Sequence, residues 1–199
     1  MIENTYIKNS GMPLRYVKEI ALCPSVSDEK AFIELKGIKE NIKDFVNNGE
    51  NLLICSNNAG NGKTSWATKL IKAYIDSVKD VSFRNNTPAL FVNVNSFINE
   101  KKLGISDPAI AKKVNSIERN ILTAKLVVFD DIGDKNLSEY DSNLLYYWID
   151  YRTANLKSCI YTSNQLPEQL KTTLSGKVYS RVVNYSKIIK FTDGDHREC

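Results

Sequence analysis

A segment rich in glycine and asparagine at residues 56–65, SNNAGNGKTS, constrains the fold of this chain more than any other feature. An apolar run at residues 52–55 precedes it, and apolar residues at helical spacing follow it. Gly62, Lys63 and Thr64 fill the last three positions of the pattern G-x-x-x-x-G-K-[ST]. Loops of this pattern connect a buried strand to a helix, and their backbone N–H groups bind phosphate oxygens. The sequence therefore predicts a phosphate loop, and the alternative is a polar turn before an ordinary helix.

Each part of the predicted loop has an expected role. Lys63 is expected to bind the β- and γ-phosphates of a nucleotide, and Thr64 to coordinate Mg²⁺. Asn57 occupies the position of the first glycine, where it would adopt a left-handed conformation at some cost. The predicted nucleotide-binding residues are Asn57, Asn58, Ala59, Gly60, Asn61, Gly62, Lys63, Thr64 and Ser65.

Polar side chains also follow two later strand-like runs. Asp130 and Asp131 come directly after four apolar residues, and ligands of open α/β sheets bind at the carboxyl ends of strands. This arrangement is that of a Walker B element, in which Asp130 would hold Mg²⁺ through water and Asp131 would polarise the attacking water. Because related ATPases often have Glu in place of Asp131, we expect slow hydrolysis. Asn164 follows the run at residues 158–163, where its amide could reach a γ-phosphate. The alternative in each case is an ordinary turn residue.

The composition fits one globular domain and argues against several classes of protein. The chain has 199 residues, of which 42% are hydrophobic, and this suffices for a buried core. It shows neither a signal-peptide pattern nor an apolar run of membrane-spanning length, so we expect a cytoplasmic protein without membrane insertion. The four cysteines lie far apart and there is a single histidine, which argues against a zinc site and a disulfide scaffold. Cys55 and Cys159 are expected in the core.

The remaining patterns predict alternating helices and strands. We expect an irregular N-terminal arm at residues 1–26, followed by one domain at residues 27–199. Beyond the loop and its helix, helices are expected at residues 27–48, 95–125 (with an interruption near residues 104–108) and 138–155, and strands at residues 52–55, 89–94, 126–129, 158–164 and 187–191.

The net charge of +4 is compatible with a nucleic-acid surface and equally with a lysine-rich solvated surface. The helical insert at residues 95–125 illustrates this ambiguity. Its lysines could face a phosphate backbone, or they could form a solvated face. They are Lys101, Lys102, Lys112 and Lys113.

Several short motifs occur in an order that is typical of a known family. The phosphate loop is followed by DDIG at residues 130–133, IDYR at 149–152, TSN at 162–164 and YSRV at 179–182. With these motifs the chain resembles the ATPase domain of the DnaC/DnaI-type replicative-helicase loaders, which are AAA+ proteins related to the IstB transposition helpers. The likeness covers roughly residues 10–197 and includes MPLRY at residues 12–16. It implies a three-layer α/β/α P-loop NTPase fold with a mostly parallel sheet and no separate C-terminal lid, and we expect a phage-encoded protein.

The resemblance also implies roles for single residues. Asn164 corresponds to sensor-1, and Arg181 to an arginine finger that reaches the γ-phosphate of a neighbouring subunit. Without the resemblance, a surface ion pair is an equal alternative for Arg181. Arg152 and Arg197 match family arginines whose roles we leave open. The implied cofactors are ATP and Mg²⁺, the metal ligands Thr64 and Asp130, and the catalytic residues Asp131, Asn164 and Arg181.

The function implied by the resemblance is that of an ATPase that forms an ATP-dependent oligomer and helps to place a DnaB-type ring helicase on single-stranded DNA. The DNA would follow the lysine-bearing insert. Cellular loaders have an N-terminal domain that grips the helicase, whereas about 26 residues precede the first core helix here. Helicase binding would therefore use this arm, another surface or a second protein.

Two other functions remain open from the sequence. One is an IstB-like helper of a transposase, which would act on duplex DNA. The other is a non-catalytic AAA+ scaffold or inhibitor of the host loader, which the residues Asn57 and Asp131 support to some extent.

Overall fold

Five short strands pair into one parallel sheet in the computed structural model, which describes residues 2–18, 22, 25–83, 87–134 and 137–192. The strand order is β2-β3-β4-β1-β5. All four pairings are parallel, so the sheet is parallel throughout its described strands and not merely in most of them. The strands are β1 (Leu52–Cys55), β2 (Ala89–Asn93), β3 (Leu126–Asp130), β4 (Ser158–Ser163) and β5 (Lys187–Lys190).

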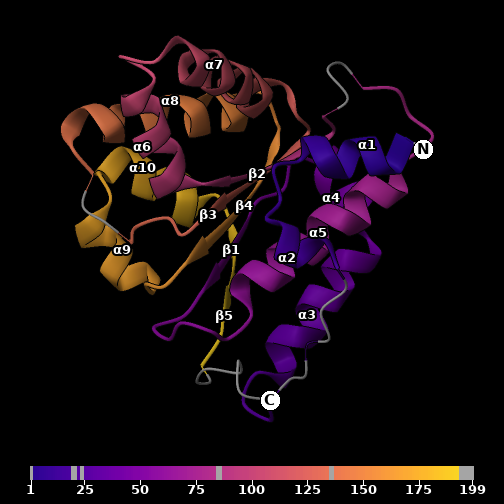
Figure 1. Ribbon diagram of the computed structural model, residues 1–199. Coiled ribbons are helices and arrows are strands. Elements are labelled where there is room, and N and C mark those ends of the chain that lie inside the picture. The colour runs from indigo at the N-terminus through magenta and orange to yellow at the C-terminus, as the bar shows by residue number, and fades with distance from the viewer. Residues whose placement is uncertain (1, 19–21, 23–24, 84–86, 135–136, 193–199) are drawn as a thin grey trace.

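Helices cover both faces of this sheet, as Figure 1 shows. One face is packed by α1 (Ile2–Asn9), α3 (Glu29–Glu40), α4 (Ile42–Asn47) and α5 (Lys63–Ser77), with α2 (Leu14–Val17) beside them. The other face is packed by α6 (Val94–Leu103), α7 (Pro108–Thr123), α8 (Glu139–Ala154), α9 (Pro167–Thr173), α10 (Gly176–Tyr179) and a single π-helical turn, η2 (Ser180–Asn184). The predicted three-layer α/β/α fold is confirmed. None of the helices in the described residues is long and apolar enough to cross a membrane.

The alternation of side chains along each strand produces two separate cores. In β1, Leu52 and Ile54 pack with α5, whereas Leu53 and Cys55 pack on the opposite face. All four residues are fully buried, because helices cover both faces of a parallel sheet. Cys55 and Cys159 are buried free thiols in the core, as predicted.

The strand order determines where the polar side chains of the sequence meet. The chain leaves β1 and returns through β2, β3 and β4 on one side of it, and only then adds β5 on the other side. Cys55 lies opposite Ser163, so the phosphate loop leaves the sheet where β4 ends. Asn93 lies opposite Asp130 in the same way. Ligand sites of open α/β sheets lie at this carboxyl edge.

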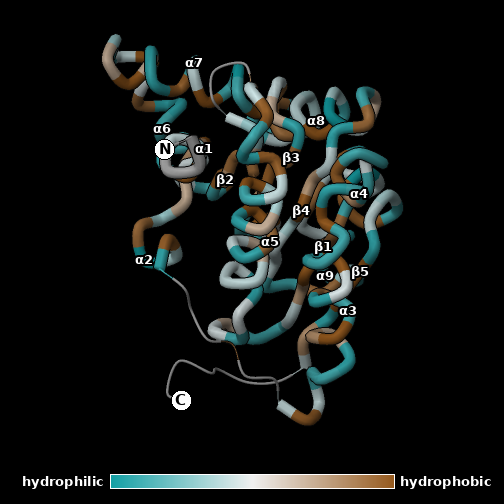
Figure 2. The backbone as a smooth tube through the Cα atoms, turned by 90° about the vertical axis from the view of Figure 1, so that its right-hand side faces the viewer, coloured by the Kyte–Doolittle hydropathy of each residue, from teal (hydrophilic) through white to brown (hydrophobic). Residues whose placement is uncertain are grey.

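The prediction of an irregular N-terminal segment was wrong, because α1 and α2 are helices. Tyr6 on α1 is buried, and its hydroxyl donates a hydrogen bond to the carbonyl of Val81 over 2.5 Å. The Phe91 amide of β2 donates to the carbonyl of Ser10 over 2.6 Å. Short helices depend on such tertiary contacts, which periodicity alone does not reveal. Figure 2 shows α1 and α2 on one side of α5, with α3 and α4 on the other.

The single helix predicted at residues 27–48 is divided into α3 and α4 at Asn41. The side-chain amide of Asn41 donates to the Gly37 carbonyl over 3.0 Å, and this bond to the preceding turn competes with a continuous helix. Asp28 directly precedes the first residue of α3. The carboxylate of Asp28 accepts hydrogen bonds from both the amide and the hydroxyl of Thr192, each over 2.8 Å, and thus ties this helix start to the segment after β5.

Candidate nucleotide-binding site

The phosphate loop lies between β1 and α5, as the sequence predicts. Gly60 and Gly62 have φ angles of 81° and 88°, a left-handed conformation that glycine adopts without a steric penalty. The α5 helix begins at Lys63, directly after this turn. The first N–H groups of a helix lack intrahelical partners, and together with the helix dipole they favour phosphate binding.

Lys63 is held inside the loop by oxygen atoms of the loop itself. Its ammonium group donates to the Asn58 carbonyl over 2.7 Å and to Oδ1 of Asn61 over 2.9 Å. The Asn61 amide in turn donates to Ser56 Oγ, which also accepts from the Asn58 amide over 2.9 Å. Burial lowers the pKa of Lys63, and the nearby carboxylates, chiefly Asp131 and Asp134, oppose this shift. A phosphate group would give this buried cation an anionic partner that the loop does not supply.

Asn57 does not have the conformation that the sequence analysis expected. Among the described residues, Asp131 and Leu156 are the non-glycine residues with positive φ, so Asn57 lies outside the left-handed region. Its side chain is exposed. The missing glycine therefore introduces no backbone strain at this position, and Asn57 offers no conformational reason for slow hydrolysis.

We predict that Asn57→Gly does not accelerate ATP turnover and lowers the free energy of unfolding by up to about 1 kcal/mol, because glycine only adds flexibility to the unfolded chain. Steady-state ATP hydrolysis and urea denaturation test these two expectations. A faster variant of equal or higher stability would mean that Asn57 strains the loop after all.

Thr64 and Asp130, the two predicted metal ligands, are in direct contact. Thr64 Oγ1 donates to Oδ1 of Asp130 over 2.9 Å, and Thr162 Oγ1 donates to the same oxygen over 2.7 Å. Oxygen ligands of this kind suit Mg²⁺, which keeps several waters and commonly binds through one or two protein groups and the phosphates of a substrate. Among the described residues there is no cluster of three or more His, Cys, Asp or Glu side chains that could hold a metal ion. The donor set therefore fits Mg²⁺ bound together with a nucleotide.

Asp131 has an unusual backbone and an unusual protonation equilibrium. Its φ of 58° is left-handed, and its amide donates to Thr162 Oγ1 over 3.0 Å. Its carboxylate accepts from the Asn93 amide over 2.9 Å. Burial, reinforced by the neighbouring carboxylates Asp130 and Asp134, raises the pKa of Asp131 to about 6. Burial raises the pKa of Asp130 as well. Two carboxylates thus share a partly buried site that favours the binding of a cation.

The raised pKa of Asp131 predicts that the nucleotide-free chain loses stability as the pH rises. Between the ordinary value of 3.8 and about 6, the folded chain retains a proton that the unfolded chain has released. The free energy of unfolding therefore decreases through this window. In magnesium-free buffer, the urea midpoint of the wild type should fall with pH relative to that of Asp131→Asn, and the difference should level off above the folded pKa. Parallel pH profiles for the two proteins would contradict the prediction.

Asn164 lies at the end of β4 and contacts the loop after β3. Its side-chain amide donates to both carboxylate oxygens of Asp134, over 3.2 and 3.0 Å. The structure thus brings Asn164 to the same sheet edge as Asp130 and Asp131 and pairs it with a carboxylate that the sequence analysis had not singled out. Its role toward a γ-phosphate remains a prediction.

Arg181 lies in η2 and is paired within its own chain. Its Nε donates to Oδ1 of Asp150 on α8 over 2.8 Å, and its guanidinium lies 5.1 Å from the centre of the Tyr185 ring. Side-chain exposures of 29% for Arg181 and 36% for Asp150 leave this ion pair accessible to solvent. A role toward a neighbouring subunit requires the pair with Asp150 to open.

Arg152 does not belong to the nucleotide site. Its side chain is fully buried, and its guanidinium donates to the carbonyls of Ile121, Ala124, Lys125 and Ser158 over 2.6–3.1 Å. Ser158 begins β4, so these contacts lie at the edge of the sheet opposite the phosphate loop. Arg152 therefore joins the end of α7 to the start of β4. Arg197 lies outside the described residues.

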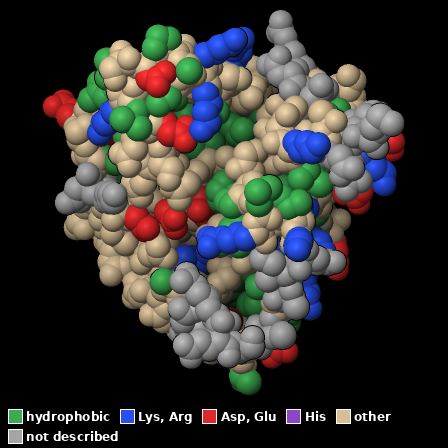
Figure 3. Space-filling view, in the orientation of Figure 1, with side chains coloured by type: hydrophobic (Ala, Val, Ile, Leu, Met, Phe, Trp, Pro, Cys, Tyr) green, Lys and Arg blue, Asp and Glu red, His purple; other side chains and the backbone are tan. Residues whose placement is uncertain are grey.

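Three of the four lysines of the predicted insert are engaged in ion pairs. Lys101 pairs with Glu118 over 2.7 Å, Lys102 with Asp141 over 2.7 Å, and Lys113 with Glu100 over 2.8 Å. Figure 3 shows acidic and basic side chains next to one another over this upper-left region of the molecule. The insert forms two helices, α6 and α7, as predicted, but its paired charges favour a solvated surface over a track for DNA.

Two residues that organise the site, Asn93 and Thr162, were not among the predicted site residues. Asn93 ends β2, and its amide contacts the carboxylates of both Asp130 and Asp131. Thr162 contributes its hydroxyl from β4 to Asp130 and Asp131. Both are polar residues near the carboxyl ends of apolar runs, so the reasoning that identified Asp130 would also have found them.

The phosphate loop, the Thr64–Asp130 pair and a parallel sheet of this strand order define a nucleotide-binding protein of the AAA+ type. The profile of the IstB-like ATP-binding proteins matches residues 6–194, and the chain belongs to this family. Comparison with curated protein sequences finds no match.

Three solved structures resemble the chain over nearly its whole length. The DnaC helicase loader has 22% identity and a TM-score of 0.70, and the alignment covers 90% of this chain and 99% of that one. DnaI has 17% identity and a TM-score of 0.70, with 94% and 95% covered. A putative primosome component from Streptococcus pyogenes serotype M3 has 18% identity and a TM-score of 0.64, with 94% and 93% covered. These likenesses confirm the AAA+ fold and the resemblance inferred from the motifs.

Proposed function

We propose that this protein is an ATP-dependent helicase loader that binds ATP between subunits and assists the placement of a ring-shaped replicative helicase on single-stranded DNA. The observation that carries the proposal is the match to the DnaC helicase loader across 99% of that chain. The phosphate loop and the Thr64–Asp130 pair support it, because they supply groups that ATP binding requires.

The residues of one chain would bind and orient the nucleotide. Lys63 would exchange its bonds to Asn58 and Asn61 for phosphate oxygens, and the N-terminus of α5 would add backbone N–H groups. Thr64 and Asp130 would hold Mg²⁺, which when bound neutralises charge on the phosphates. Asp131 would orient the attacking water, and the Asn164 amide would turn from Asp134 toward the γ-phosphate.

Arg181 would complete the site from a neighbouring subunit. A guanidinium stabilises the charge that develops on the transferred phosphoryl group. In the isolated chain Asp150 holds Arg181 in an ion pair, so assembly would release it. Hydrolysis would then depend on oligomer formation.

Co-purification with the replicative helicase, with and without ATP, tests the proposed function. ATP-dependent retention of the helicase, together with more helicase bound to single-stranded DNA, is the expected result. Unchanged helicase loading in the presence of the protein and ATP would overturn the proposal.

The family match also supports a second function, that of a transposition helper, because the matching profile is that of IstB-like proteins. As a transposition helper the chain would assemble on duplex DNA, and a transposase gene beside its own would favour this role. A third possibility, a non-catalytic scaffold or inhibitor of a host loader, would show no ATP turnover. Measured hydrolysis distinguishes that scaffold from both ATPases.

A further inference from the structure

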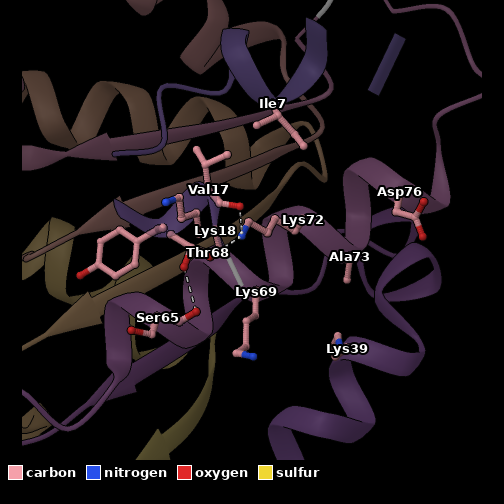
Figure 4. Close-up of a pocket in the computed structure, with 11 residues that line it drawn as sticks. Ile7, Val17, Lys18, Lys39, Ser65, Thr68, Lys69, Lys72, Ala73 and Asp76 are labelled. Carbon is pink, nitrogen blue, oxygen red and sulfur yellow. Dashed lines mark hydrogen bonds between the residues drawn. The ribbon is translucent and has the colours of Figure 1, made fainter. Parts of the chain in front are cut away.

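A groove follows the outer face of α5, the helix that begins at the phosphate loop. It has a volume of about 330 Å³ and extends along α5 from Ser65 to Asp76. The C-terminal end of α2 forms one wall, and Lys39 of α3 contributes from the other side (Figure 4). We call this the α5 groove. Its length along the helix is about 16 Å from the rise per residue of an α-helix.

The α5 groove is strongly basic. Lysines line it from three segments, and the carboxylate of Asp76, the acidic residue in its lining, pairs with Lys79 over 3.2 Å. Four lysines and one aspartate line the groove, so its lining carries a net positive charge. The lysines of the groove are Lys18, Lys39, Lys69 and Lys72.

One of these lysines builds the wall of the groove. The ammonium group of Lys72 donates to the carbonyls of Val17 and Lys18, over 2.7 and 3.1 Å. These bonds fix the end of α2 over α5, so the groove exists in the free chain. Lys18 and Lys39 are exposed, and Lys69 is partly exposed.

An aromatic ring lies in the same lining. Tyr16 on α2 borders the groove, and the guanidinium of Arg15 lies 4.5 Å from the centre of its ring. Basic grooves with aromatic side chains are typical of surfaces that bind single-stranded nucleic acid, because lysines bind phosphates and rings stack on bases.

We propose that the α5 groove binds a single strand of nucleic acid, with Lys18, Lys39 and Lys69 on its phosphates and Tyr16 against a base. The proposal rests on the proposed function and names the surface that holds the strand. Lysines spread along an open groove act as point charges, which suits a chain of phosphates better than one small anion. The strand and ATP would both contact α5, because this helix provides Lys63 at its start and Lys69 in the groove.

Charge reversal at the two exposed positions tests the groove. We compare Lys18→Glu/Lys39→Glu with Lys112→Glu/Lys113→Glu on α7, which changes the net charge equally. Binding of a fluorescein-labelled oligothymidylate is measured by anisotropy over a range of salt concentrations. Loss of two phosphate contacts should lower the slope of log affinity against log salt concentration by about 1.4. The affinity gained between 1 M and 0.1 M salt should therefore be about 25-fold smaller in the groove variant than in the wild type. Binding of a fluorescent ATP analogue should stay unchanged in both variants.

Each outcome of this comparison has one meaning. A loss confined to the groove variant supports the proposal. Equal losses would show that binding follows net charge, and a loss confined to the α7 variant would place the strand on the insert; either result overturns the groove. If the wild-type protein binds no oligothymidylate while it still loads helicase, the groove proposal fails and the loader function stands. If thermal melting shows that Lys18→Glu/Lys39→Glu is misfolded, the milder variant Lys18→Gln/Lys39→Gln is used instead. It should also weaken binding of the oligothymidylate.

Discussion

Replacing Arg152 by methionine is expected to lower the free energy of unfolding by about 3–5 kcal/mol, because each buried acceptor left without a donor costs about 1–3 kcal/mol and several are left. The guanidinium satisfies four backbone carbonyls around the end of α7 and the start of β4. Methionine fills a similar volume but donates no hydrogen bond, so these carbonyls lose their partner where water has little access. The shift in the urea denaturation midpoint measures the loss.

Arg181→Met is the matched control, because the same substitution there removes a solvent-accessible ion pair. Such pairs contribute about 0–1 kcal/mol, so this variant should unfold close to the wild type. Arg152→Lys should fall between the two, since one ammonium group reaches fewer of the four carbonyls. Equal stabilities of Arg152→Met and Arg181→Met would refute the structural role assigned to Arg152.

The elements of the nucleotide site were predictable from short-range patterns. The phosphate loop occupies consecutive residues, and Asp130 follows directly on an apolar strand. The rule that ligands bind at the carboxyl ends of parallel strands then brings β1, β3 and β4 together without knowledge of any side-chain contact. This is why the sequence identified Thr64 and Asp130 as partners although 66 positions separate them.

Features that depend on contacts between distant segments were not predictable in this way. The helix α1 exists through the burial of Tyr6 and its bond to Val81. The role of Arg152 depends on the carbonyl groups of α7 and β4, and motif order alone had left it open. The α5 groove forms because Lys72 binds the end of α2, which is 55 residues away along the chain. Asn57 was misjudged for a different reason, since a motif gives the residue expected at a position but not its backbone angles.

Lys63→Ala is expected to reduce ATP turnover by about 100- to 1,000-fold, the usual effect of removing one group that stabilises charge in the transition state. Lys63 is 5% exposed, and its bonds to Asn58 and Asn61 hold its ammonium group within the loop. Alanine leaves the phosphate oxygens without this cation, so ATP binding should weaken along with hydrolysis. Phosphate release under steady-state conditions and titration with a fluorescent ATP analogue measure the two effects separately.

Lys36→Ala on α3 is the matched control, because this lysine is exposed and far along the chain from the loop. It should retain wild-type turnover, which would show that the loss in Lys63→Ala does not follow from the removal of any positive charge. If the wild-type protein binds ATP but hydrolyses none of it, even in the presence of helicase and single-stranded DNA, the result favours a non-catalytic scaffold. Asp131 would then have no catalytic role. If Lys63→Ala hydrolyses ATP as fast as the wild type, the phosphate loop is not where the reaction takes place. A large loss of ATP turnover in Lys63→Ala, with none in Lys36→Ala, would therefore show that the phosphate loop is the site of ATP hydrolysis.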